Sequence, residues 1–129
     1  MKINIKDPPR GFTVGNSVRF EMRDCGNITL SPDEQVTFVT PAGGEFDVAR
    51  KDWGFYATPS LNGRLPQFGL RTALIRNTMT GRYFILLVEK GRESNFDAYL
   101  IQESCVVVSW LDSTEALDNL RLALEAAGK

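Results

Sequence analysis

The sequence contains no histidine and only two cysteines, and these absences exclude several kinds of chemistry. Ser/His/Asp and Cys/His mechanisms need an imidazole base, so neither can operate within this chain. Zinc sites that use histidine are excluded for the same reason, and two cysteines cannot supply a four-cysteine site. Carboxylates could still bind magnesium or calcium, but no EF-hand loop or GxxxxGK[ST] phosphate loop occurs. We therefore expect no metal site and no cofactor.

The sequence also lacks any apolar run near the roughly 18 residues that a membrane-spanning helix needs. Residues 1–9 contain no apolar core of signal-peptide length, so we expect a cytoplasmic protein. Cys25 and Cys105 would be compatible with one disulfide, but in that compartment two reduced thiols are expected. A pI near 5.5 and a net charge of −1 argue against partners such as nucleic acid or a membrane surface.

Acidic residues are absent from one long stretch, Trp53 to Val88, which contains four arginines and no lysine. This stretch carries +4, and because the whole chain carries −1, the rest of it carries −5. Arginine is expected where a planar fork binds a carboxylate or phosphate through two hydrogen bonds. Two interpretations follow: either the arginines are solvated or paired with acids from flanking segments, or they line a groove that binds an anion. The four are Arg64, Arg71, Arg76 and Arg82.

Hydrophobic periodicity and turn residues predict an α+β fold in a single domain, residues 1–129. An antiparallel β-meander is followed by a ββαβ sheet, and a C-terminal helix closes the fold. The predicted segments are an extended arm (1–16), the meander (17–56), an ordered loop (57–70), the ββαβ sheet (71–111) and the C-terminal helix (112–128).

Several details of this architecture follow from local patterns. The run Arg82–Val88 is apolar on both sides behind its first residue, which predicts the central strand of the sheet. A turn is expected at 24–27. Ser94 is expected to start a helix over 95–102, which would connect two parallel strands as a crossover.

The C-terminal helix is expected to begin at Asp112 as its cap and to be amphipathic. Leu117, Leu120 and Leu124 form one stripe, which we expect to pack on the sheet. Leu122 lies off that stripe, and an exposed leucine there would allow a helix-to-helix contact in a homodimer.

The candidate site lies where the aromatic run meets the arginine-rich loop. We expect Arg64 and Arg71 to bind the anion, Asn62 to hydrogen-bond hydroxyl groups, and Trp53 or Tyr56 to stack on the ligand. An aromatic cluster of this kind is more commonly part of a core, and both interpretations stay open.

Three segments carry a resemblance, namely Lys51–Leu65, Tyr83–Lys90 and Val108–Asp112. Together they make the chain similar to small uncharacterised bacterial proteins encoded among surface-polysaccharide biosynthesis genes. The resemblance covers about Gly11 to Asp112 and leaves the last helix as an extension. It implies a connection with carbohydrates or nucleotide-sugars, and it implies no particular activity, catalytic residue or cofactor.

Three functional hypotheses result. The first is a non-catalytic binding or accessory protein that holds an anionic small molecule, such as a phosphate, sugar acid or nucleotide-sugar, or a partner's acidic surface. The second is an enzyme acting on a sugar or nucleotide-sugar, with Asp52 as general base and Arg64 stabilising developing negative charge. The third is a structural adaptor that dimerises through the C-terminal helix.

Overall fold

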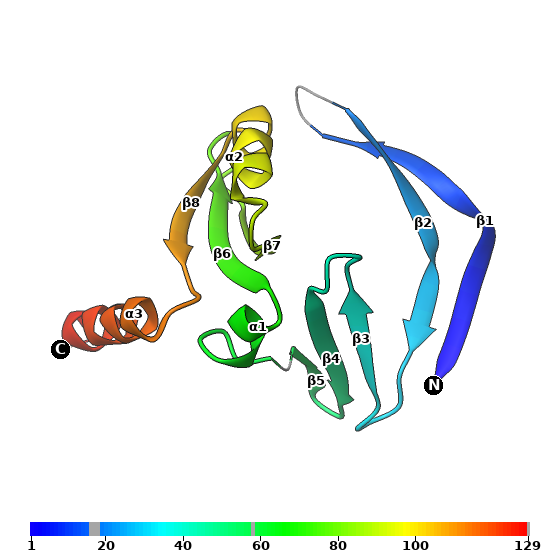
Figure 1. Ribbon diagram of the computed structural model, residues 1–129, viewed down its shortest axis with the longest axis horizontal. Helices are drawn as coiled ribbons and strands as arrows, with labels where there is room; N and C mark the ends of the chain where they lie inside the picture. The colour runs from blue at the N-terminus through cyan, green and yellow to red at the C-terminus, as the bar shows by residue number, and fades with distance from the viewer. Residues whose placement is uncertain (16–18, 58, 129) are drawn as a thin grey trace. The chain divides into compact units, whose positions relative to one another are not determined.

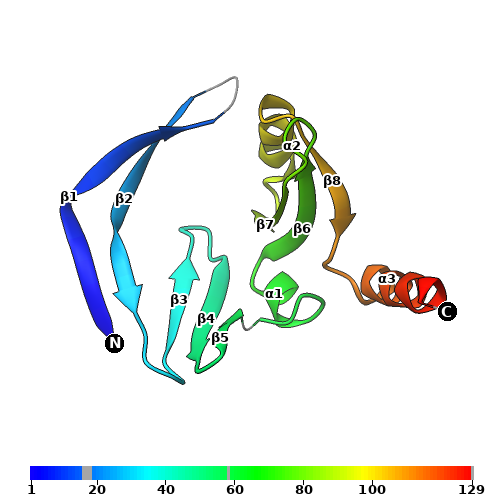
Figure 2. The ribbon, with the colours of Figure 1, turned by 180° about the vertical axis from the view of Figure 1, so that it is seen from behind.

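The computed structural model describes residues 1–15, 19–57 and 59–128, and it has an α+β fold with three antiparallel sheets (Figures 1 and 2). The chain divides into two compact units, Met1–Thr37 with Asp47–Thr58, and Phe38–Phe46 with Pro59–Lys129. The elements are β1 (Lys2–Val14), β2 (Phe20–Thr29), β3 (Gln35–Val39), β4 (Glu45–Lys51), β5 (Gly54–Ala57), α1 (Arg64–Gln67), β6 (Leu70–Asn77), β7 (Tyr83–Glu89), α2 (Glu93–Gln102), β8 (Cys105–Trp110) and α3 (Thr114–Ala127).

The first unit begins with a long hairpin in which β1 pairs antiparallel with β2. The extended arm predicted for residues 1–16 is thus a strand paired with β2 over the residues of β1, and residues 16–18 lie outside the described part of the chain. Pro8 and Pro9 fall in the register irregularity between Ile5 and Arg10, where a missing backbone N–H costs least. The alternation of apolar residues on either side of the prolines is sufficient for a strand.

The turn expected at 24–27 is also absent, because these residues lie inside β2. Gly26 has a φ of 137°, and a Cβ at this position would overlap the carbonyl oxygen of Asn4 on β1. The glycine is thus required for close approach of two paired strands and does not end one.

A second sheet has the strand order β3-β4-β5. Its last two strands are joined by the turn Asp52–Trp53, since Lys51 pairs with Gly54. The division between the units falls within β3 and β4. Residues Phe38–Phe46, which include the end of β3 and the start of β4, belong to the second unit.

The second unit contains the sheet β7-β6-β8, in which β7 and β8 each pair antiparallel with β6. β7 and β8 consequently run in the same direction, with α2 as the connection between them, which confirms the predicted ββαβ order. The central strand, however, is β6 and not the predicted Arg82–Val88 run. Most apolar positions of β6 are buried, whereas Tyr83, Phe84 and Ile85 of β7 are exposed.

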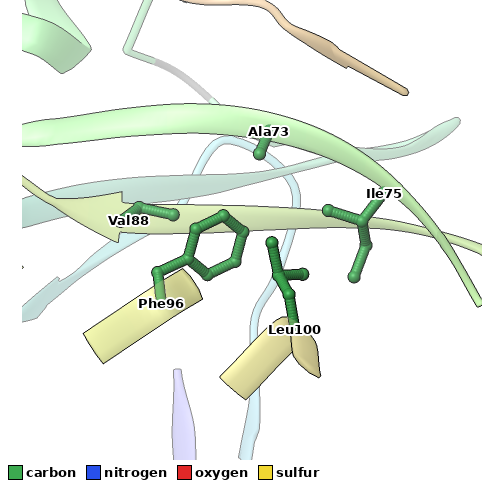
Figure 3. Close-up of a cluster of buried hydrophobic side chains, with 5 residues drawn as sticks. All are labelled: Ala73, Ile75, Val88, Phe96 and Leu100. Atoms are coloured by element: carbon green, nitrogen blue, oxygen red, sulfur yellow. The ribbon is translucent and has the colours of Figure 1, made fainter. Parts of the chain in front are cut away.

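The core of this unit lies between one face of the sheet and α2. Figure 3 shows Phe96 and Leu100 pointing from α2 towards Ala73, Ile75 and Val88 of the strands. All five side chains are buried, and the ring of Phe96 meets that of Trp110 edge-on with 5.7 Å between centroids. This cluster fixes α2 on the sheet.

The start of α2 differs from the prediction. The helix begins at Glu93, its N-cap is Arg92, and no side chain caps it, so the capping role expected for Ser94 was wrong. Instead the Glu93 carboxylate accepts a hydrogen bond of 2.6 Å from the backbone N–H of Gly91. A carboxylate in the first turn satisfies an N–H just before the helix and favours the helix dipole.

The turn between β6 and β7 is organised by Asn77. Its Oδ1 accepts hydrogen bonds from the backbone N–H groups of Met79 and Thr80 at 2.9 and 3.0 Å, and its Nδ2 donates to the carbonyl of Glu103 at 3.1 Å. We expect Asn77→Ala to lower the free energy of unfolding by about 2 kcal/mol, because a buried carbonyl and two turn N–H groups lose their partner. Urea unfolding measures this, and Met79→Ala, at a 77% exposed position of the same turn, should leave the stability almost unchanged.

α3 is the element whose environment departs furthest from expectation. It contains no buried residue, and Leu120, Leu122 and Leu124 are all exposed. The prediction that the leucine stripe packs on the sheet of its own chain was therefore wrong. Its N-cap is Ser113, whose hydroxyl accepts from the N–H of Ala116 at 3.1 Å, and not Asp112.

Candidate functional site

The four arginines of the acid-free stretch do not converge on one place. Arg71 and Arg76 lie on β6 five residues apart, and an odd separation puts their side chains on opposite faces of the sheet. Arg64 is the first residue of α1, and its guanidinium lies over the ring of Phe68 at 5.2 Å. The shared concavity expected from the charge pattern is therefore not formed by Arg71 and Arg76.

Arg71 is held inside an ion-pair cluster of its own unit. Its Nε donates to the Asp112 carboxylate at 2.6 Å and its Nη1 to the Glu93 carboxylate at 3.2 Å, while the guanidinium lies 4.0 Å from the ring centroid of Trp110. The side chain of Arg71 is 27% exposed and that of Asp112 17%. This corresponds to the first interpretation of the arginines, pairing with acids from flanking segments.

The electrostatics of the cluster follow from its hydrogen bonds. The bond to Asp112 raises the pKa of the Arg71 guanidinium above its ordinary value, with a smaller contribution from Glu93. The pKa of the Glu93 carboxyl is lowered, first by the backbone N–H groups of Glu93 itself and Gly91, and then by Arg71. The charged forms of Arg71 and Glu93 are thus both stabilised, and because two carboxylates already bind Arg71, its guanidinium is not open to an added anion.

The same cluster fixes the root of α3. Asp112 is the second residue after β8, and the N–H of Leu111 before it donates to the carbonyl of Thr72 at 2.9 Å. Asn62 donates from Nδ2 to the hydroxyl of Thr114, the first residue of α3, at 3.1 Å. Two residues expected to bind a ligand, Arg71 and Asn62, therefore hold the connection between β8 and α3.

The remaining predicted residues belong to the first unit. Trp53 lies in the turn between β4 and β5 and is 69% exposed, and Tyr56 on β5 is 52% exposed. The alternative that these aromatics form a core was wrong, since Phe55 is also exposed. Asp52 is exposed in the same turn. A stacking role for Trp53 or Tyr56 stays a prediction.

Two hollows formed by the described residues contain none of the predicted site residues. One, of about 210 Å³, lies on the β1-β2 hairpin and is lined by apolar residues such as Ile3, Ile5 and Ile28. The other, of about 240 Å³, lies in the second unit beside Phe68 and Glu89, and the Glu89 carboxylate accepts a hydrogen bond from Thr40. Among the described residues that line them, neither hollow has two carboxylates that could act as an acid and a base.

The described part of the chain was searched for clusters of metal-binding side chains and for helices that could cross a membrane. Within residues 1–15, 19–57 and 59–128, no group of three or more histidine, cysteine or carboxylate side chains is placed to hold a metal ion. None of the helices described is long and apolar enough to cross a membrane. Both cysteines are free thiols.

The surface of α3 is a candidate interface that the sequence pattern did not identify as such. The stripe Leu117, Leu120 and Leu124 is accompanied along one side by Ala116, Ala123 and Ala127, and no residue of it is buried. Ala116 and Leu117 at its start are half-buried, and Leu120 and Leu124 further along are exposed. A helix of 14 residues whose apolar stripe is left open along most of its length by the described residues has the composition of an interface. The signal in the sequence was the stripe itself, which was assigned to the sheet of the same chain.

Comparisons of the chain with protein-family models, curated proteins and solved structures find no match. The resemblance to proteins encoded among surface-polysaccharide biosynthesis genes therefore stays a prediction.

Proposed function

We propose that the chain is a non-catalytic adaptor that self-associates, with α3 as the element that contacts a second copy. The observation that carries this proposal is that a 14-residue helix bearing three leucines in one stripe has no buried residue. An adaptor of this kind needs no cofactor, metal or acid-base pair, and it uses the C-terminal helix as its interface.

The energetics of an isolated helix support this role. In water, helices shorter than about 12–15 residues are marginal, because the cost of nucleation is not recovered without tertiary packing. The Ser113 cap contributes about 1 kcal/mol. The Arg121–Glu125 pair, with both side chains 56% exposed, adds about 0.2–0.5 kcal/mol. Burying Leu120 and Leu124, which are 41% and 64% exposed, against a partner would contribute up to about 1.5–3 kcal/mol each, more than these local terms.

The adaptor proposal predicts that Leu120→Glu dissociates the protein. The wild-type chain should elute and scatter light as a species of twice 14.4 kDa, and the variant as one of 14.4 kDa, because a buried carboxylate would oppose the apolar contact. Leu122 is also exposed, as the alternative contact between helices through this residue requires, so Leu122→Glu distinguishes the two contacts. Leu122 lies on the opposite side of the helix from the stripe, and its substitution should leave the dimer intact if the stripe is the interface. A wild-type chain that is monomeric at high protein concentration would overturn the proposal.

The two other hypotheses gain less support. An anion site built on Arg71 and Asn62 would have to break the Asp112 and Thr114 contacts before it could accept a ligand. An enzyme that uses Asp52 as a base would need a cleft around it, and Asp52 lines neither of the two hollows described above. The adaptor role requires no rearrangement of the described contacts.

A further inference from the structure

The sheet of the second unit has one face covered by α2 and a second face that is covered only in part. On this second face the strand register places Arg76 beside Tyr83 and Val106 in one row, and Leu74 beside Ile85 in the next. Tyr83, Ile85 and Val106 are 60%, 56% and 48% exposed. We call the residues Leu74, Arg76, Tyr83, Ile85 and Val106 the open patch.

The other end of the same face is closed. Leu70 and Thr72 are 6% and 1% exposed, and α1, which contacts β6, buries its Leu65 completely. The covering by α1 therefore stops short of the open patch. An exposed, mainly apolar patch next to a covered region of the same sheet face is a surface on which a further element can dock.

The α3 of the same chain is poorly placed to be that element. Arg71 projects to the α2 side of the sheet, so its bond to Asp112 holds the connection after β8 on that side. The bond from Asn62 to Thr114 then ties the first residue of α3 to the segment that leads into α1. To reach the open patch of its own chain, α3 would have to break these contacts or displace Leu65.

From these constraints we propose that α3 of one copy docks on the open patch of a second copy, and that the exchange is reciprocal. This inference rests on the proposed self-association through α3 and names the surface that receives it. Reciprocal exchange of a terminal helix closes a two-fold dimer with two identical contacts and leaves no unpaired surface of the same kind.

The two surfaces match in extent. Leu117 to Leu124 spans about 10 Å along the helix axis, given a rise of about 1.5 Å per residue. The three strands that carry the open patch span about the same distance, since neighbouring strands lie about 4.8 Å apart. A helix stripe of this length can contact all three strands at once.

The two surfaces also match in charge. α3 carries Glu115, Asp118 and Glu125 against the single Arg121, a net charge of −2. The open patch carries Arg76, whose guanidinium lies over the Tyr83 ring at 6.0 Å and which forms no ion pair with the residues that the structure describes. A cation in the acceptor surface and an excess of acids on the helix favour this pairing over α3 against α3, which would bring like charges together.

Ile85→Glu tests the acceptor surface directly. The variant should lose the dimer and scatter light as a 14.4 kDa species, while Ile101→Glu should stay dimeric because Ile101 is 81% exposed on α2, away from both surfaces. If Ile85→Glu remains dimeric while Leu120→Glu is monomeric, the docking inference is wrong and the adaptor proposal stands. If the wild-type chain itself is monomeric, both are wrong.

A mixing experiment separates loss of docking from loss of folding. Tagged Ile85→Glu retains an intact α3, and untagged Leu120→Glu retains an intact open patch, so the two monomeric variants together should form a heterodimer through one remaining contact. Affinity capture of the tagged chain should then retain the untagged one, and neither variant should be captured by a tagged copy of itself. Failure of the mixture to associate, with both variants folded by circular dichroism, would overturn reciprocal docking.

Discussion

Replacing Phe96 by alanine should lower the free energy of unfolding by about 3–5 kcal/mol, because the ring is removed from the centre of the small core. Phe96 is 8% exposed and belongs to a cluster of five buried residues. Its edge-on contact with Trp110 contributes about 0.5–1.5 kcal/mol beyond the area it buries. Since domains have total stabilities of about 5–15 kcal/mol, the loss would be a large fraction of what is present.

Urea unfolding followed by tryptophan fluorescence measures this loss, since Trp110 packs on the side chain that is removed. Ile101→Ala on the same helix is the matched control: at 81% exposure it should change the stability by no more than about 0.5 kcal/mol. Equal losses in the two variants would mean that α2 is not anchored on the sheet by the face that carries Phe96.

Much of the fold could be predicted because its signals are local. Alternating polarity and apolar runs indicated the strands of the β6-β7 hairpin. The order β6-β7-α2-β8 followed from the length and pattern of the connection. The strands, the helix and their order depend on residues that are close together in the sequence, so they can be predicted from local patterns.

The position of a strand within a sheet was not predictable in the same way. The apolar run of β7 suggested a central strand, yet Tyr83 and Ile85 lie on an exposed face. A strand that is apolar on both sides indicates that both of its faces will be buried. It does not indicate whether the same chain or a second copy buries them. The same ambiguity explains α3, whose leucine stripe indicates burial without naming the partner surface.

The predicted anion site is not formed because its arginines lie on different faces of the sheet, and the sequence already contained part of this information. Arg71 and Arg76 are five residues apart within one expected strand, and the two-residue period of a strand already separates them. The ion-pair partners of Arg71 could not be identified from the sequence. Asp112 and Glu93 lie 41 and 22 residues away along the chain, and Asp112 was assigned to a helix cap that Ser113 provides instead.

Arg71→Ala should lower the free energy of unfolding by about 2–3 kcal/mol, because two charged hydrogen bonds and a stacked guanidinium are lost and Asp112 is left without its cation. A double-mutant cycle with Asp112→Ala should give a coupling energy of about 1–3 kcal/mol, as expected for a pair in direct contact. The matched control is the cycle for Arg121 and Glu125, an exposed pair on α3, for which about 0.2–0.5 kcal/mol is expected.

The pH dependence of the free energy of unfolding shows how much the Glu93 carboxylate contributes to the cluster around Arg71. Its pKa is lowered in the folded state, so its contribution is present above the pKa it has in the unfolded chain and is lost as pH falls through the folded value. The wild-type protein should therefore lose stability on acidification more steeply than Glu93→Gln, which has no carboxyl group to protonate. Parallel acid profiles for the two proteins would show that Glu93 is solvated, and that Arg71 is held by Asp112 and Trp110 alone.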